Sequence, residues 1–253
     1  MSRIKYGIDL GTTNSAIAVI EKGESVIIKS EIQKDTMPSC VGINKKKSIS
    51  VGERTFNQLN SEKLAALKKG KANSSNTFIE FKRTMGSDKK YHSSFMETDF
   101  SSEDLSSEVL KKLKSFVQND SFKSVVITIP AMFNDNQKSA TQKSAELAGF
   151  SQVELLQEPI AAAIAYGLDE KVKDGQILIF DFGGGTFDVC LVNVEDGIMQ
   201  VKDTEGDNWL GGKNLDNAIV DEILISYLKE NYSIDSFLED ENKKALLKDA
   251  LKV

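Results

Sequence analysis

One short pattern occurs twice in this chain and restricts its fold more than any other feature. Two apolar, strand-like runs, beginning at residues 4 and 176, each end in an aspartate that is followed by glycine and threonine, in DLGTT (9–13) and DFGGGT (181–186). Two further β-rich runs follow each of them, which predicts a three-stranded antiparallel meander in both places. A helix is expected after each meander, so the repeated order strand, strand, strand, helix indicates two related lobes.

The other expected elements follow a regular order along the chain. After the first meander (4–10, 15–20 and 25–29), a Lys-, Ser- and Asn-rich stretch from about 44 to 100 indicates an insertion before a core helix with apolar spacing from Leu105 to Val117. Strands and helices then alternate at 124–130, 135–150, 152–156 and 158–168, as is typical of parallel β-α-β units. The second meander, from 176 to 206, precedes helices expected at about 212–231 and 239–253.

Composition excludes several classes of protein. A chain of 253 residues can bury a full core in one large domain or two lobes. Its net charge of -6 provides no basic surface for nucleic acid. Cys40 and Cys190 lack disulfide or metal-binding spacing and are expected to be buried as small apolar groups. We expect a cytoplasmic protein without a membrane partner, because Asp9 interrupts any export signal and the apolar runs are too short to span a bilayer.

The residues of the two turns predict a site for phosphate. Turns made of small residues can direct several backbone N–H groups at one point, and glycine permits the necessary close approach. Asp9 and Asp181 would repel phosphate directly, so they imply a bridging cation, for which Mg²⁺ is the best match. Thr12, Thr13 and Thr186 add hydroxyl donors. Two such turns that face each other would clamp a polyphosphate.

A simpler interpretation is that Gly183, Gly184 and Gly185 only form a tight hairpin. The repetition of the turn at matched positions of two meanders favours the phosphate site. No P-loop is present, because GDNWLGGKN (206–214) resembles one but places Lys213 and Asn214 out of register.

Six blocks of this sequence resemble the ATPase domain of the DnaK-type seventy-kilodalton heat-shock chaperones. In chain order they are DLGTTNS (9–15), FKRTMGS (81–87), VVITIPAMFNDNQKSAT (125–141), LLQEPIAAAIAYGLDE (155–170), IFDFGGGTFDV (179–189) and GDNWLGGKNLDN (206–217). The FKRTMGS block and the short insertion before it are most similar to the bacterial HscC branch. The resemblance implies an α/β, actin-like ATPase fold, in which two ribonuclease-H-like lobes hold Mg-ATP or Mg-ADP between them.

The resemblance also implies roles for individual residues. Asp9 and Asp181 would hold Mg²⁺ through water, and Lys82 would place the attacking water and offset charge on the transferred phosphoryl group. Glu158, Asp181 and Thr186 would complete the catalytic set with Lys82, and K⁺ would assist. The implied cofactor-binding residues are Gly11, Thr12, Thr13, Asn14, Gly183, Gly184, Gly185, Asp188, Gly211 and Gly212.

Three of the singled-out residues have simpler interpretations from sequence alone. Lys82 is one of 32 Lys and Arg residues and could be a solvated surface lysine. Glu158 precedes Pro159 and could only start a helix, where an acidic residue suits the helix dipole. His92, the single histidine, is expected to be exposed.

Five positions depart from the family pattern. Lys138 stands where Arg is usual, and it lacks the planar fork of arginine, so coupling to a substrate domain is expected to be altered. The others are Gln157, Ile160, Trp209 and Lys213, which replace the common Asn, Thr, His and Glu. None of the five removes a phosphate contact.

The resemblance divides the chain into a first lobe at 1–170 and an incomplete second lobe at 171–253, without a peptide-binding domain. The family's adenosine-binding segment would follow residue 253, so we expect weak Mg-ATP binding and uncovered apolar faces on strands 176–205. The implied partners are unfolded polypeptides, bound through the missing domain, a J-domain co-chaperone and a nucleotide-exchange factor.

Three functions compete at this stage. The first is an ATP hydrolase module that drives peptide binding and release by a chaperone. The second is an actin-fold small-molecule kinase, against which the continuous chaperone blocks argue. The third is a truncated, non-catalytic lobe that serves as an interaction unit.

Overall fold

The computed structural model describes residues 4–69, 76–117, 122–168, 172–207 and 209–251. Its largest sheet has six strands, with β4 (Met37–Pro38) paired to β2 and the order β11-β10-β1-β2-β3 along the main path. The bounds are Tyr6–Asp9 for β1, Asn14–Glu21 for β2, Glu24–Ile27 for β3, Ser124–Ile129 for β10 and Gln152–Gln157 for β11. Strands β1 to β3 are antiparallel, whereas β10 and β11 join them in parallel. The predicted first meander and the β-α-β units are therefore confirmed.

Two helices bury the main core against this sheet. Helix α2 (Ser102–Ser115) places Leu105, Val109, Leu110 and Leu113 in the core, and it packs against α3 (Asp135–Leu147). Both helices start with capping boxes, in which the side chain of Ser101 or Asn134 accepts a hydrogen bond from the third helical residue. Polar cap residues followed by apolar residues at helical spacing explain why the sequence predicted both helices.

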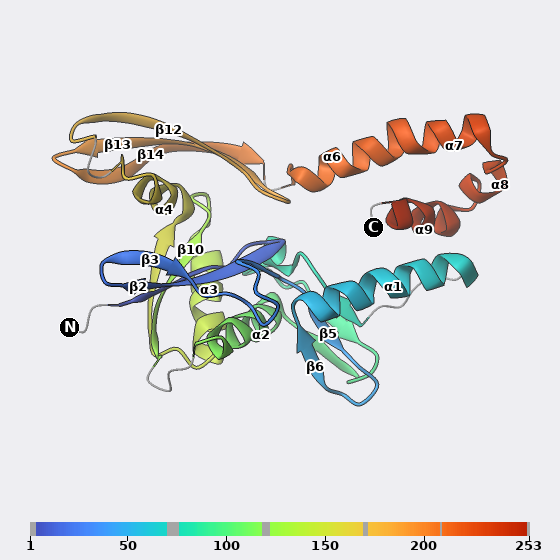
Figure 1. Cartoon of the computed structure of the whole chain (residues 1–253), viewed down its shortest axis with the longest axis horizontal. Coiled ribbons are helices and arrows are strands. Elements are labelled where there is room, and N and C mark those ends of the chain that lie inside the picture. The colour runs from blue at the N-terminus through green and yellow to red at the C-terminus, as the bar shows by residue number, and fades with distance from the viewer. Residues whose placement is uncertain (1–3, 70–75, 118–121, 169–171, 208, 252–253) are drawn as a thin grey trace.

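Helix α4 (Glu158–Ala165) lies between the large sheet and a second sheet, which contains three antiparallel strands (Figure 1). These strands are β12 (Gly175–Phe182), β13 (Phe187–Glu195) and β14 (Ile198–Asp207), and they confirm the second meander. One face buries Cys190, Val192 and Val194. On the other face Leu178, Phe180 and Phe182 are 56%, 66% and 48% exposed, so the expectation of an uncovered apolar face is confirmed for these described residues.

The segment after the first meander contains more structure than the sequence predicted. A small sheet pairs β5 (Val41–Ile43) with β6 (Ile49–Val51) and β7 (Thr77–Phe78), beside the long helix α1 (Glu53–Lys69). A 3-10 helix spans Phe81–Thr84. A hairpin of β8 (Tyr91–Ser93) and β9 (Thr98–Phe100) follows, with His92 exposed as expected. The segment expected at 44–100 as a plain insertion therefore carries its own sheet and helix.

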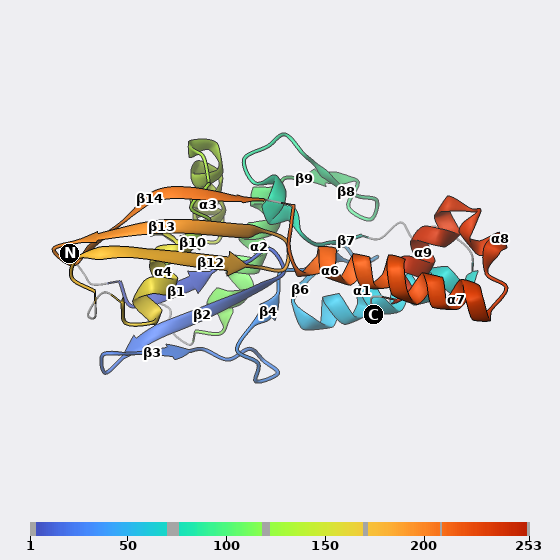
Figure 2. The same cartoon turned by 90° about the horizontal axis from the view of Figure 1, so that it is seen from above.

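The helices after the second sheet reach back over the inserted segment. Helix α6 (Gly212–Ala218), a π-helical turn at Ile219–Leu224 and α7 (Ile225–Asn231) form one continuous rod, as predicted for 212–231. After α8 (Asp235–Leu238), helix α9 (Glu241–Leu251) packs against α1, and both helices lie on the side of the molecule away from the second sheet (Figure 2). We call the second sheet with α6 to α9 the second lobe, and the described residues before it the first lobe. The predicted boundary at residue 170 lies outside the described residues.

Both cysteines are buried and unpaired, as expected. Burial raises the pKa of the Cys40 thiol to about 12, so this group stays protonated and behaves as an apolar side chain. Within the described part of the chain, none of the helices combines the length and the apolarity that crossing a lipid bilayer requires.

Candidate active site

A cavity of about 500 Å³ lies where the first turns of the two meanders meet. Its walls are Asp9, Gly11, Thr12, Thr13, Asn14, Lys82, Thr128, Glu158, Ala161, Ala162, Asp181, Gly183, Gly184 and Thr186. Residues that are far apart in the sequence, at the ends of β1 and β12 and at the start of α4, thus surround one space. Most of the site residues that the sequence predicted are in this set.

Side-chain hydrogen bonds from neighbouring residues hold the first turn (10–13) in place. The Gly11 N–H donates to Ser15 Oγ at 3.2 Å, and the Ser39 hydroxyl donates to the Gly11 carbonyl at 2.7 Å. A Cβ at Gly11 would lie 2.0 Å from the carbonyl oxygen of Asn14, so only glycine fits this position. At the end of β1, Thr128 Oγ1 donates to Asp9 Oδ1 at 3.0 Å and orients that carboxylate.

The second turn (183–186) lies directly against the first. The Gly183 N–H donates to the carbonyl of Thr186 at 2.9 Å and closes the turn. A Cβ at Gly184 would lie 2.3 Å from Thr13 Oγ1, so the two turns touch at this glycine. The tight-hairpin interpretation describes only part of this turn, because its residues also form one wall of the cavity.

At the cavity the buried Lys82 forms an ion pair with Glu158, which is partly buried. Lys82 is only 7% exposed, its Nζ lies 2.8 Å from Glu158 Oε1, and it lies 5.8 Å from the ring centroid of Phe133. The interpretation of Lys82 as a solvated surface lysine is therefore wrong. Burial raises the pKa of Glu158, the nearby Lys82 opposes that rise, and the charges of Asp9 and Asp181 add to it. Glu158 does begin α4, as the simpler interpretation required, but it also faces this pair.

Asp188 is a buried carboxylate next to the same wall. It is 3% exposed and stands opposite Asp181 in the register of β12 and β13. Burial, followed by the charge of Asp181, raises the pKa of Asp188, and its Oδ1 has no hydrogen-bond partner among the described residues. A buried acceptor without a partner destabilises the fold unless a cation or water satisfies it. This side chain thus suits a bound cation.

We expect Asp188→Asn to stabilise the nucleotide-free protein by on the order of 1 kcal/mol at neutral pH. Because the pKa of Asp188 is raised in the folded state, its protonation stabilises the fold relative to the unfolded chain. This contribution to stability is fully present below the ordinary pKa of 3.8 and is lost as the pH rises through the pKa of the folded state. The advantage of the variant should therefore be small near pH 4 and increase toward pH 7.5. Denaturant unfolding at both pH values, without Mg²⁺, measures it. An equal difference at both values would contradict the account.

The donor set at the cavity fits Mg²⁺ held mainly through water. Among the described residues, no three acidic, histidine or cysteine side chains are close enough to enclose a metal ion by themselves. Mg²⁺ commonly keeps several waters and takes one or two carboxylates together with phosphate oxygens. Asp9 and Asp181, which both line the cavity, offer that arrangement.

Four predicted site residues do not line the cavity. Asp188 lies buried behind it, and Gly212 belongs to a second cavity of about 310 Å³ that shares Thr12, Thr13 and Gly184 with the first. Gly185 and Gly211 pack against each other, because a Cβ at Gly211 would lie 2.4 Å from the Gly185 nitrogen.

Three lining residues, Thr128, Ala161 and Ala162, were missed by the sequence reasoning. The polar Thr128 within the apolar strand SVVITI, and the small residues in IAAAIA, were the available signals.

The fold belongs to the actin-like class of ATPases. This class is defined by a ribonuclease-H-like sheet, a second meander and a cavity between their first turns. The family model for Hsp70 protein matches residues 5–253, and the chain belongs to the Hsp70 family. It is 40% identical over 248 residues to a protein described as "Chaperone protein DnaK" from Thermosipho africanus (strain TCF52B). That alignment covers 96% of this chain and 39% of the relative, so the chain spans about two fifths of the relative's length.

Proposed function

We propose that this chain binds Mg-ATP in the cavity between the two turns and hydrolyses it, as part of the ATPase domain of a DnaK-type chaperone. The observation that carries this proposal is the ion pair of Lys82 and Glu158 beside two glycine- and threonine-rich turns. Phosphoryl transfer to water requires positioning and charge stabilisation more than a covalent nucleophile. A lysine, several carboxylates and backbone donors around one cavity supply those requirements.

Backbone donors at both turns support the phosphate assignment. Among the described residues, no hydrogen-bond acceptor is found for the N–H groups of Thr12, Thr13, Gly184 and Gly185. Three of these residues line the cavity. Successive free N–H groups in a turn form a concave site for anions, and two such turns would hold a polyphosphate from both sides.

Lys82 would act on the transferred group. Its ammonium lies at the cavity wall and would offset negative charge that develops on the phosphoryl oxygens. Glu158 would hold this lysine in place, and its other oxygen would orient the attacking water. The Thr186 hydroxyl would lie close to the terminal phosphate and donate a hydrogen bond to it.

The carboxylates would organise cations. Asp9 and Asp181 would hold the waters of Mg²⁺, and Asp188, with its unpartnered Oδ1, would accept from one of those waters or contact K⁺. When bound, Mg²⁺ would neutralise phosphate charge and polarise the group that is transferred.

The wider biology follows from family membership. We propose that the protein works in the cytoplasm, that nucleotide turnover controls the binding of unfolded polypeptides, and that a J-domain co-chaperone and a nucleotide-exchange factor regulate it. The relation to the HscC branch stays a prediction.

Gly184→Ala tests the proposed site. The added methyl group would lie 2.3 Å from Thr13 Oγ1 and push the turns apart, so we expect Mg-ATP affinity to fall about tenfold or more. Gly7→Ala is the matched control, because a Cβ at Gly7 meets nothing within 4 Å. Calorimetric titration of the intact protein measures both. An affinity of Gly184→Ala within twofold of the wild type would reject this position of the phosphates.

The two alternative functions give different results in simple assays. A small-molecule kinase would consume ATP faster when an acceptor such as glycerol is added, whereas a hydrolase would not. A non-catalytic lobe would give no heat on titration with Mg-ATP.

A further inference from the structure

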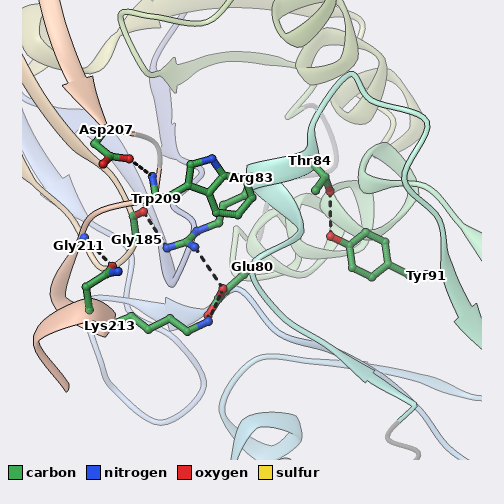
Figure 3. Close-up of polar contacts among 10 residues, drawn as sticks. Glu80, Arg83, Thr84, Tyr91, Gly185, Asp207, Trp209, Gly211 and Lys213 are labelled. Carbon is green, nitrogen blue, oxygen red and sulfur yellow. Dashed lines mark hydrogen bonds and ion pairs between the residues drawn. The ribbon is translucent and has the colours of Figure 1, made fainter. Parts of the chain in front are cut away.

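A second cluster of charged and aromatic residues joins the two lobes beside the cavity, as Figure 3 shows. Arg83 follows Lys82 in the 3-10 helix of the first lobe and is 9% exposed at its side chain. Its Nη2 donates to the carbonyl oxygen of Gly185, in the second turn, at 2.7 Å. The bond connects residues that are 102 positions apart.

The guanidinium of Arg83 is held in place from both lobes. Its Cζ lies 5.3 Å from the ring centroid of Trp209, and its Nη1 lies 3.8 Å from Glu80 Oε2. Glu80 in turn accepts hydrogen bonds from Lys213 Nζ at 2.5 and 2.7 Å. Arginine stacks on aromatic faces and presents a planar set of donors that lysine lacks. Of the residues that depart from the family pattern, Trp209 thus contacts Arg83 directly, and Lys213 is connected to it through Glu80.

All three glycine carbonyls of the second turn accept hydrogen bonds. The N–H of Gly212 donates to Gly183, and the N–H of Lys213 donates to Gly184, each at 3.0 Å. These two donors belong to the second lobe itself. Arg83 supplies the third bond, to Gly185, and this bond comes from the first lobe. A Cβ at Gly185 would lie 2.3 Å from Arg83 Nη2, so the close approach depends on glycine.

We propose that Arg83 is a positioning residue for hydrolysis: it fixes the second turn relative to Lys82, its neighbour in the chain. The proposal rests on the proposed function. Phosphates held by the second turn must lie at the correct distance from a lysine on the other lobe, and a misplacement of about 1 Å can lower a rate about 100-fold. Trp209 and Glu80 hold the guanidinium in the orientation that this bond requires.

The test compares variants of the intact protein in single-turnover hydrolysis at saturating Mg-ATP, with nucleotide affinity measured in parallel. For Arg83→Ala we expect a rate at least about tenfold lower and an affinity within about threefold of wild type. Arg83→Lys should recover part of the rate, because its ammonium can still donate to Gly185 but stacks less well. Arg54→Ala, at an exposed arginine of α1, is the matched control and should keep the wild-type rate.

A spectroscopic measurement follows the contact without depending on ATP. Trp209 is the single tryptophan of the chain, so its fluorescence reports on the cation beside its ring. Arg83→Ala should make this emission more accessible to acrylamide quenching. If Arg83→Ala does not fold, Trp209→Leu tests the positioning role instead. Trp209 is 62% exposed, so its replacement should lower the hydrolysis rate about threefold without unfolding the protein.

The possible outcomes distinguish the positioning role of Arg83 from the proposed ATP hydrolysis itself. No hydrolysis by the wild type would overturn both. Wild-type hydrolysis together with an Arg83→Ala rate within twofold of it would overturn the positioning role alone. Parallel losses of rate, affinity and melting temperature would indicate a purely structural residue and would also overturn the proposal.

Discussion

Replacing Lys82 by alanine is expected to lower ATP turnover about 100-fold or more while nucleotide binding persists. The lysine is buried beside the cavity and paired with Glu158, so its charge is weakly screened by water and would act on the transferred phosphoryl group. The two turns do not depend on this side chain, because other backbone and side-chain hydrogen bonds hold them. The loss should therefore fall on the rate and not on the affinity.

Single-turnover hydrolysis by the intact protein is the measurement for Lys82→Ala. Lys82→Met is the second variant, since it keeps the alkyl chain beside Phe133 and removes only the charge. Lys111→Ala, at an exposed lysine of α2 that pairs with Glu108, is the control for an unspecific loss of charge. A rate within threefold of wild type in both Lys82 variants would end the catalytic assignment.

Asp9→Asn and Asp181→Asn should each raise the Mg²⁺ concentration needed for half-maximal hydrolysis about tenfold or more. Each carboxylate lies on one wall of the cavity and would hold waters of the cation, so neutral amides should weaken the site without closing it. A titration of hydrolysis with Mg²⁺ measures the midpoint. Asp88→Asn, in an exposed part of the chain, is the control. Unchanged midpoints in both variants would show that the cation is held elsewhere.

The sequence predicted the large sheet well because its signals are local. Apolar runs, capping residues and the alternation of strand and helix marked β1, β2, β10 and α3 within a few residues of their observed ends. The strands of the inserted segment were not predicted, because β5, β6 and β7 have only two or three residues, too few to display an alternating pattern. Helix α1 was not predicted, because polar and charged residues occupy much of its length and obscure its apolar spacing.

The sequence predicted those residues of the cavity wall that belong to local motifs. Asp9, Asp181 and the glycines could be selected from the sequence because a carboxylate followed by small residues occurs twice, each time at the end of an apolar run. Thr128 was missed because its role depends on a parallel neighbour strand that brings it to Asp9 from 119 residues away. Arg83 and Gly185 meet only after both lobes have folded, so no local pattern could reveal their bond.

A crystal structure of the intact protein with Mg²⁺ and a non-hydrolysable ATP analogue would show directly whether the nucleotide binds between the two turns. We expect the phosphates between the first turn and the second turn, with Lys82 beside the terminal phosphate and the Mg²⁺ waters against Asp9 and Asp181. Density for the nucleotide outside this cavity, or phosphates that contact neither turn, would contradict this expectation.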